Sequence, residues 1–173
     1  MLAILLFVNA LAVAGFAGGC LCLSIALGAL LGGDPDEGAR VMRLLLPRMG
    51  SLMAPLLGAS MLSALVLAVG SLRAKRAARG GDADGRELRR RWLVVGSFFA
   101  ILVVTVSVHL PLNAALLEAA LPTPARASLV LERWLLWHHV RTALALFALG
   151  VLLWPLQAAR SARGAATEAL QTK

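Results

Sequence analysis

The sequence predicts an all-α integral membrane protein, a bundle of four membrane-spanning helices with both termini in the cytoplasm. The chain of 173 residues is 60% hydrophobic and only 15% charged, whereas an ordinary soluble domain is about a quarter charged. The apolar residues form four long runs, and most of the basic residues lie in blocks between or after these runs. We therefore treat residues 1–173 as a single membrane domain.

Each of the four apolar runs is long enough to cross a hydrocarbon core, which takes about 20 helical residues. The predicted spans cover residues 2–31, 52–72, 92–112 and 134–156. The first run resembles a signal peptide only superficially. It has no basic segment before it and is longer than a typical signal-peptide core, so the sequence predicts a retained helix.

The orientation follows from the basic residues. The loop 73–91 holds eight Lys or Arg residues against three Asp or Glu residues, and the tail 157–173 adds more basic residues. Basic segments stay on the cytoplasmic side, so this loop and both termini are predicted to be cytoplasmic. Topology thus explains the net charge of +8. We expect the lipid bilayer as a partner and no nucleic acid.

The four tryptophans also fit a membrane protein. Trp92 and Trp154 are predicted at the inner interface, and Trp134 and Trp137 at the outer one, which is typical of aromatic belts. No GxSxG, HExxH, CxxC, P-loop or dinucleotide fingerprint is present. Hydrolase, redox-disulfide and nucleotide chemistry of the soluble type is therefore unsupported.

Polar residues enter the apolar spans at two places. His109 and Asn113 are four residues apart near the end of the third span, with Pro111 between them, which loosens or ends a helix. In the fourth span Trp134, His138 and Arg141 share one helical face, and Thr142 extends it. His139 is rotated away from that face by about 100°.

Ionisable residues inside a span mark a functional site by default. Arg141 lies on the order of 10 Å below Trp134 along the helix. We expect His109, Asn113, His139 and Arg141 to converge in the outer half of the bundle. A structural role is the alternative, in which Arg141 locks two helices together and Asn113 caps a helix.

A metal or haem site is a second alternative. His109, His138 and His139 are the candidate ligands, because imidazole suits Zn, Cu and Fe. Adjacent histidines on a helix do not usually point at one ion. We therefore predict no cofactor and keep the metal site as the weaker hypothesis.

These motifs resemble the anthrone-oxygenase-like family of small four-helix membrane proteins, many of which have no assigned function. The resemblance rests on Pro111-Leu112-Asn113, on Trp134, Trp137, His139, Val140, Arg141 and Thr142, and on Leu46-Pro47-Arg48 followed by Met53-Ala54-Pro55. It extends from the first span to the fourth. Two residues depart from the pattern: bacterial members usually have asparagine at position 138, and His109 is not part of the common motif.

The resemblance implies oxidation of an anthrone-type aromatic compound to an anthraquinone by O2, in a bacterial cytoplasmic membrane. It suggests His139 as the base, with Arg141 and Asn113 stabilising the resulting oxyanion. The substrate would be held by four further residues: Trp134, Trp137, His138 and His109. The rival predictions are a non-catalytic assembly or partner subunit, and a protein that binds a metal, haem or quinone.

Overall fold

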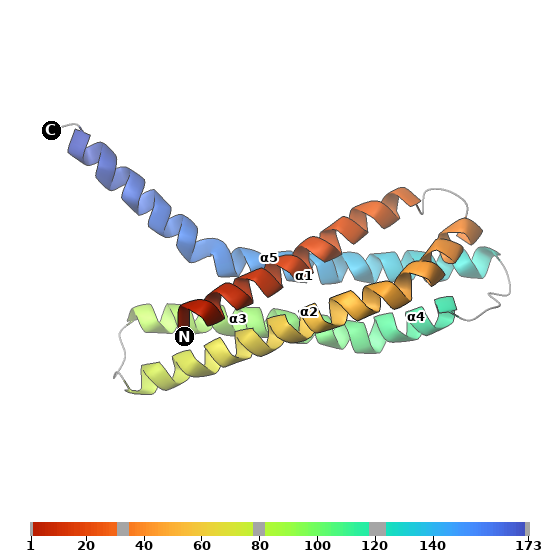
Figure 1. Cartoon of the computed structure of the whole chain (residues 1–173), viewed down its shortest axis with the longest axis horizontal. Helices are drawn as coiled ribbons and strands as arrows, with labels where there is room; N and C mark the ends of the chain where they lie inside the picture. The colour runs from red at the N-terminus through yellow and green to blue at the C-terminus, as the bar shows by residue number, and fades with distance from the viewer. Residues whose placement is uncertain (1, 31–34, 78–81, 118–123, 172–173) are drawn as a thin grey trace.

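The computed structural model describes residues 2–30, 35–77, 82–117 and 124–171, and every one of them is helical. In chain order the elements are α1 (Leu2–Leu30), α2 (Pro35–Ala77), α3 (Asp82–Val104), the π-helix η1 (Thr105–His109), α4 (Leu110–Leu117) and α5 (Pro124–Gln171) (Figure 1). The elements α3, η1 and α4 follow one another without a break. The described chain therefore forms four rods, which confirms the predicted all-α class.

Each rod contains a stretch long and apolar enough to cross a membrane: Leu2–Gly28, Arg40–Ala74, Gly85–Leu117 and Ser128–Trp154. The helices extend beyond the predicted spans. α2 begins well before residue 52, and α3 begins well before residue 92. The physical reason is that Arg, Lys and Glu are good helix formers, so a helix continues after its apolar run has ended.

The rods form a four-helix bundle. α1 and α3 each pack against both α2 and α5, and α2 also contacts α5 across the bundle. The start of α1, the end of α2 and the start of α3 lie at one end, toward which α5 also runs, and the last part of α5 projects away from the other helices (Figure 1). This arrangement brings both termini to the same end. That this end faces the cytoplasm remains a prediction from the charge pattern.

The interior is apolar and so is much of the outer surface. Phe16 of α1 and Phe98 of α3 meet edge to face in the core, with ring centroids 5.9 Å apart. Large side chains such as Ile4, Phe7 and Leu62 are more than 60% exposed on the outside. A soluble monomer rarely exposes such surface, whereas lipid covers it without cost.

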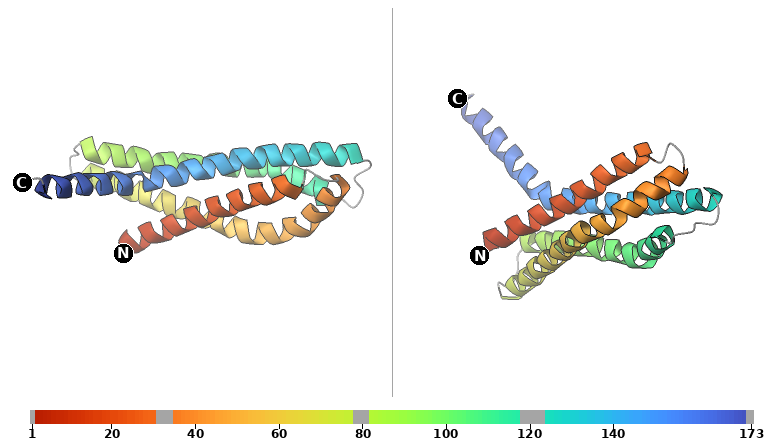
Figure 2. Two further views of the ribbon diagram at one scale, coloured as in Figure 1. Left: turned by 90° about the horizontal axis from the view of Figure 1, so that it is seen from above. Right: turned by 45° about the vertical axis from the view of Figure 1, so that its right-hand side comes forward.

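Two of the rods are distorted at prolines. α2 contains Pro47 and Pro55 and is visibly bowed (Figure 2). In the third rod the α-helix widens into η1 just before Pro111, and the N–H of Leu110 donates to the carbonyl of Thr105, five residues back. Pro111 therefore loosens the helix without ending it, since α4 continues to Leu117.

Candidate functional site

The inward face of α5 carries a polar cluster. Trp134, His138, Arg141 and Thr142 are all buried, and they are four, three and one residues apart. The rings of Trp134 and His138 are stacked, with centroids 4.9 Å apart and planes 11° apart. The predicted common face of these residues is confirmed, and it faces the inside of the bundle.

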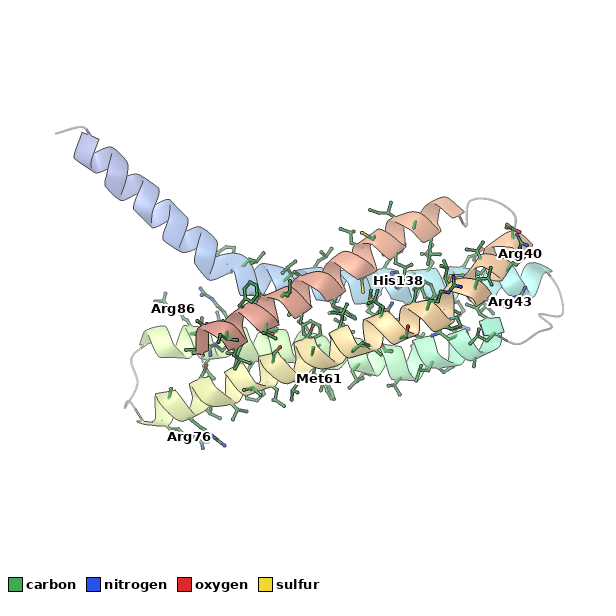
Figure 3. The ribbon with its side chains drawn as sticks, viewed as in Figure 1. Arg40, Arg43, Met61, Arg76, Arg86 and His138 are labelled. Carbon is green, nitrogen blue, oxygen red and sulfur yellow. The ribbon has the colours of Figure 1, made fainter. Side chains whose placement is uncertain are left out.

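His138 is held at both ring nitrogens (its place on α5 is labelled in Figure 3). Nη2 of Arg141 is 2.8 Å from its Nδ1, and the backbone oxygen of Cys20 on α1 is 3.0 Å from its Nε2. A guanidinium only donates, so Nδ1 must be the acceptor. Nε2 therefore carries the hydrogen and donates it to Cys20. His138 is neutral, and no lone pair remains for another partner.

Hydroxyl groups complete the connection between α1 and α5. Thr142 donates to the carbonyl of His138 over 2.9 Å, and its oxygen is 3.1 Å from the hydroxyl of Ser24. Ser24 also donates to the carbonyl of Cys20 over 3.0 Å. No local pattern in the sequence predicted the part played by Cys20, because its backbone oxygen is a group that any residue supplies and its thiol lies beside Arg141 only where α1 packs against α5.

The third rod brings His109 and Asn113 to the same cluster. The ring of His109 meets that of Trp134 edge to face at 5.2 Å, and Asn113 Oδ1 accepts a 2.7 Å hydrogen bond from Trp134 Nε1. Indole only donates, so the NH2 group of Asn113 remains a donor for something else. The predicted proximity of the two spans is thus present.

The imidazole of His109 is in an unusual position. Only 1% of the residue is exposed, yet neither ring nitrogen has a hydrogen-bond partner. The carbonyl of Trp137 faces the ring but does not reach hydrogen-bonding geometry. A neutral imidazole has one N–H and one lone pair, so His109 holds a free acceptor inside the bundle.

Arg141 is equally unusual. It is 8% exposed, it gives one hydrogen bond to His138, and its Nε has no partner. Within the described ranges the ion pairs belong to Glu37 and Glu87, neither of which pairs with Arg141. A positive charge is therefore buried in the bundle with no carboxylate partner among the described residues, an arrangement that favours an anion beside it.

His109 and Arg141 both line a cavity of about 150 Å³. Its polar residues are Thr105, His109, Asn113, Trp134 and Arg141, and the rest of its wall comes from Leu110 of α4 and from residues of α1 and α2. Its volume is similar to that of an apolar protein cavity that accepts one benzene ring, about 150 Å³. The cavity can therefore receive one ring of a flat aromatic molecule and set it beside an arginine and an imidazole.

The family model described as anthrone oxygenase matches residues 42–151. This range is well over half of the chain and includes every residue of the polar cluster except those on α1. The chain belongs to the anthrone oxygenase family. Searches of the curated proteins and of the solved structures found no match. The family resemblance predicted from the motifs is confirmed.

For this member of the anthrone oxygenase family, His139 lies away from the cavity. It is exposed on the outer face of α5, and Trp137 is only half-buried and does not line the cavity. The expected convergence thus includes His109, Asn113 and Arg141, while His138 takes the place expected for His139. One residue turns an α-helix by about 100°, so only one of two adjacent histidines can face inward.

Trp134 also departs from its expected position. It is 2% exposed, whereas Trp92 is 42% and Trp154 is 62% exposed. Placing Trp134 in an outer aromatic belt was wrong, because its indole N–H is satisfied by Asn113 inside the bundle rather than by headgroups or water. Trp92 and Trp154 have the exposure of belt residues.

The histidines do not form one ligand set. Among the described residues no group of three His, Cys, Asp or Glu side chains is placed to hold a metal ion. His138 has both nitrogens engaged, and His139 faces outward. His109 is the one of the three that lines the cavity and has no hydrogen-bond partner at either ring nitrogen.

Proposed function

We propose that this protein oxidises a flat, weakly acidic aromatic ketone of the anthrone type with O2, giving a quinone and water. The observation that carries the proposal is that His109 and Arg141 both line a largely apolar cavity and that both ring nitrogens of His109 and Nε of Arg141 have no hydrogen-bond partner. Such groups are costly unless a ligand satisfies them. An aromatic ketone that becomes an enolate satisfies both.

His109 is the base in this proposal. His109 lines the cavity and keeps a free lone pair on one ring nitrogen, and this lone pair would accept the proton from the acidic benzylic carbon. His138 cannot do so while Arg141 occupies its Nδ1. His139, suggested by the family motif, is on the outside of α5. The three histidines thus have different roles, with only His109 placed to take up a proton from a bound ring.

Arg141 and Asn113 stabilise the enolate oxygen. Both residues line the same cavity, and the donors that they would offer are Nε of Arg141 and the NH2 group of Asn113. Donors that are fixed in place before the charge develops lower the barrier, because no reorganisation is needed at the moment of reaction. His138 positions Arg141 through the 2.8 Å hydrogen bond.

The remaining steps need only O2. The enolate gives up electrons to O2, a C–O bond forms at the benzylic carbon, and the imidazolium of His109 returns its proton to give a hydroperoxide. Loss of the second benzylic hydrogen as a proton then breaks the O–O bond, so that the carbon becomes a carbonyl. One O2 is consumed and one water is released for each quinone formed.

The test compares His109→Ala with His139→Ala in protein reconstituted in lipid vesicles. Oxygen uptake and quinone absorbance are followed with anthrone as substrate. We expect His109→Ala to lower the rate about a hundredfold or more, as for loss of a general base, and His139→Ala to retain the parental rate. The reverse order would overturn the assignment of the base. A parent rate equal to that of empty vesicles would show a non-catalytic protein.

A further inference from the structure

We propose that the substrate enters the cavity sideways from the bilayer, through a mouth between α2 and α4 formed by Gly50, Ala54 and Leu110. All three residues line the cavity and are exposed on the outside of the bundle. The inference rests on the proposed function for the identity of the ligand. It adds the route of entry and the class of molecule that can take it.

The mouth is built by small residues on a bent helix. Gly50 and Ala54 are one turn apart on the same face of α2, and a Cβ atom placed on Gly50 would meet nothing within 4 Å. Pro47 and Pro55 flank this turn, and α2 bows there (Figure 2). A proline removes a backbone hydrogen bond and tilts the helix. The two prolines thus account for the bend of α2 beside the mouth.

The depth of the mouth suits an amphipathic aromatic molecule. Arg48, two residues before Gly50, is exposed on α2, and an arginine on a span keeps its guanidinium at the headgroups. At about 1.5 Å per residue, Gly50 is on the order of 3 Å and Ala54 on the order of 9 Å deeper than Arg48. Flat aromatic rings with one polar edge reside at this level of a bilayer.

The residues of the cavity wall determine which membrane-soluble molecules can bind behind the mouth. His109 and Arg141 lie in the cavity wall with unpaired nitrogens, so the entering edge must carry an acidic C–H or an oxygen. The cavity holds about one ring, so the part of a fused aromatic substrate beyond the reacting ring would remain in the mouth, among lipid. A lipid acyl chain fits the apolar part but leaves both polar groups unsatisfied.

Two glycines on α2 provide a matched test. Gly58 is exposed like Gly50, and a Cβ atom there also meets nothing within 4 Å, but Gly58 does not line the cavity. A protein that keeps Trp134 as its one tryptophan (Trp92, Trp137 and Trp154 replaced by Phe) is reconstituted in phosphatidylcholine vesicles. Anthraquinone dissolved in the bilayer is the probe, because an electron-poor quinone quenches a neighbouring indole.

We expect anthraquinone to quench the fluorescence of Trp134. In the Gly50→Phe variant the phenyl ring fills the mouth, so the anthraquinone concentration needed for the same quenching should rise roughly tenfold or more. The Gly58→Phe variant should be quenched at the same anthraquinone concentrations as the parent protein. If Gly50→Phe does not fold, Ala54→Leu against Gly58→Leu gives the same comparison. A sulfonated anthraquinone, which stays in water, should not quench Trp134.

Three results would overturn the mouth: equal effects of the two glycine substitutions, no effect of Gly50→Phe, or equal quenching by the sulfonated probe. The measurement is separate from turnover. A parent protein that binds anthraquinone through Gly50 but does not oxidise anthrone would refute the proposed oxidation and keep the mouth. If the parent protein oxidises anthrone and the Gly50→Phe variant binds and reacts normally, the mouth is refuted and the proposed oxidation stands.

Discussion

Two groups of buried polar residues lie in this apolar bundle, and they differ in how their hydrogen bonds are satisfied. The first joins α1 to α2: Asn9 and Ser63 share a 2.9 Å hydrogen bond, and Ser60 donates to the carbonyl of Leu56 over 2.7 Å. Each has a partner inside the bundle. Paired groups of this kind hold membrane helices together.

The second group, around His109 and Arg141, is incompletely paired. In the parts of the chain that the structure describes, the buried side-chain nitrogens or oxygens without a partner are both ring nitrogens of His109 and Nε of Arg141. Both residues line one cavity. An unpaired buried polar group costs about 1–3 kcal/mol. The paired group therefore serves the fold, and the unpaired group is the one to which we assign the proposed ligand.

The largest expected effect comes from Arg141. Arg141→Gln keeps a donor but removes the charge, so we expect the rate of anthrone oxidation to fall about a hundredfold, as for loss of a transition-state donor. Arg48→Gln, on the exposed face of α2, is the control and should retain the rate. Stopped-flow measurement of quinone formation compares the two. Equal rates for Arg141→Gln and the parent would show that the buried charge has no part in the reaction.

An intermediate effect is expected for His138. His138→Leu leaves Nη2 of Arg141 unpaired and removes one of the donors to the Cys20 carbonyl, which keeps Ser24, so we expect a loss of about 1–3 kcal/mol in unfolding free energy and a slower reaction. Asparagine offers one acceptor and one donor, as the neutral imidazole does. His138→Asn should therefore restore most of both properties. A rate for His138→Asn as low as that of His138→Leu would mean that imidazole itself is required.

The smallest effects concern stability, and they should have opposite signs. Asn9→Leu removes a satisfied hydrogen bond and should lower the unfolding free energy by about 0.6 kcal/mol, the average for membrane helices. His109→Leu removes two unsatisfied nitrogens and should raise it by about 1 kcal/mol. Denaturant titration in detergent measures both changes. A destabilised His109→Leu protein would indicate that the imidazole is bonded within the fold.

Helical periodicity was sufficient to predict part of the site. It placed Trp134, His138 and Arg141 on one face and His139 on another, as the structure shows. The expectation that His139 would join Arg141 rested on their similar depth in the span, and depth does not decide which helical face points inward. Which of the two faces points inward depends on where α1 packs, and no local pattern in α5 contains that information.

Other parts of the site had no signal in the sequence. The acceptor on α1 is the backbone oxygen of Cys20, and it meets His138 only because α1 lies against α5. A count of apolar residues also could not predict where the helices begin and end, since α2 and α3 continue into charged segments. The first case depends on a contact between residues far apart in the chain, and the second on the helix propensity of charged residues outside the apolar runs.

By itself, the sequence determined the all-α membrane class, the four spans and the family, because hydrophobic length, charge asymmetry and short motifs are local properties. It also determined that His109, Asn113 and Arg141 enter apolar helices at a cost. Only the tertiary structure decided which histidine is engaged and which is free, and where the cavity lies. Those answers depend on which helix faces meet, and long-range packing sets that.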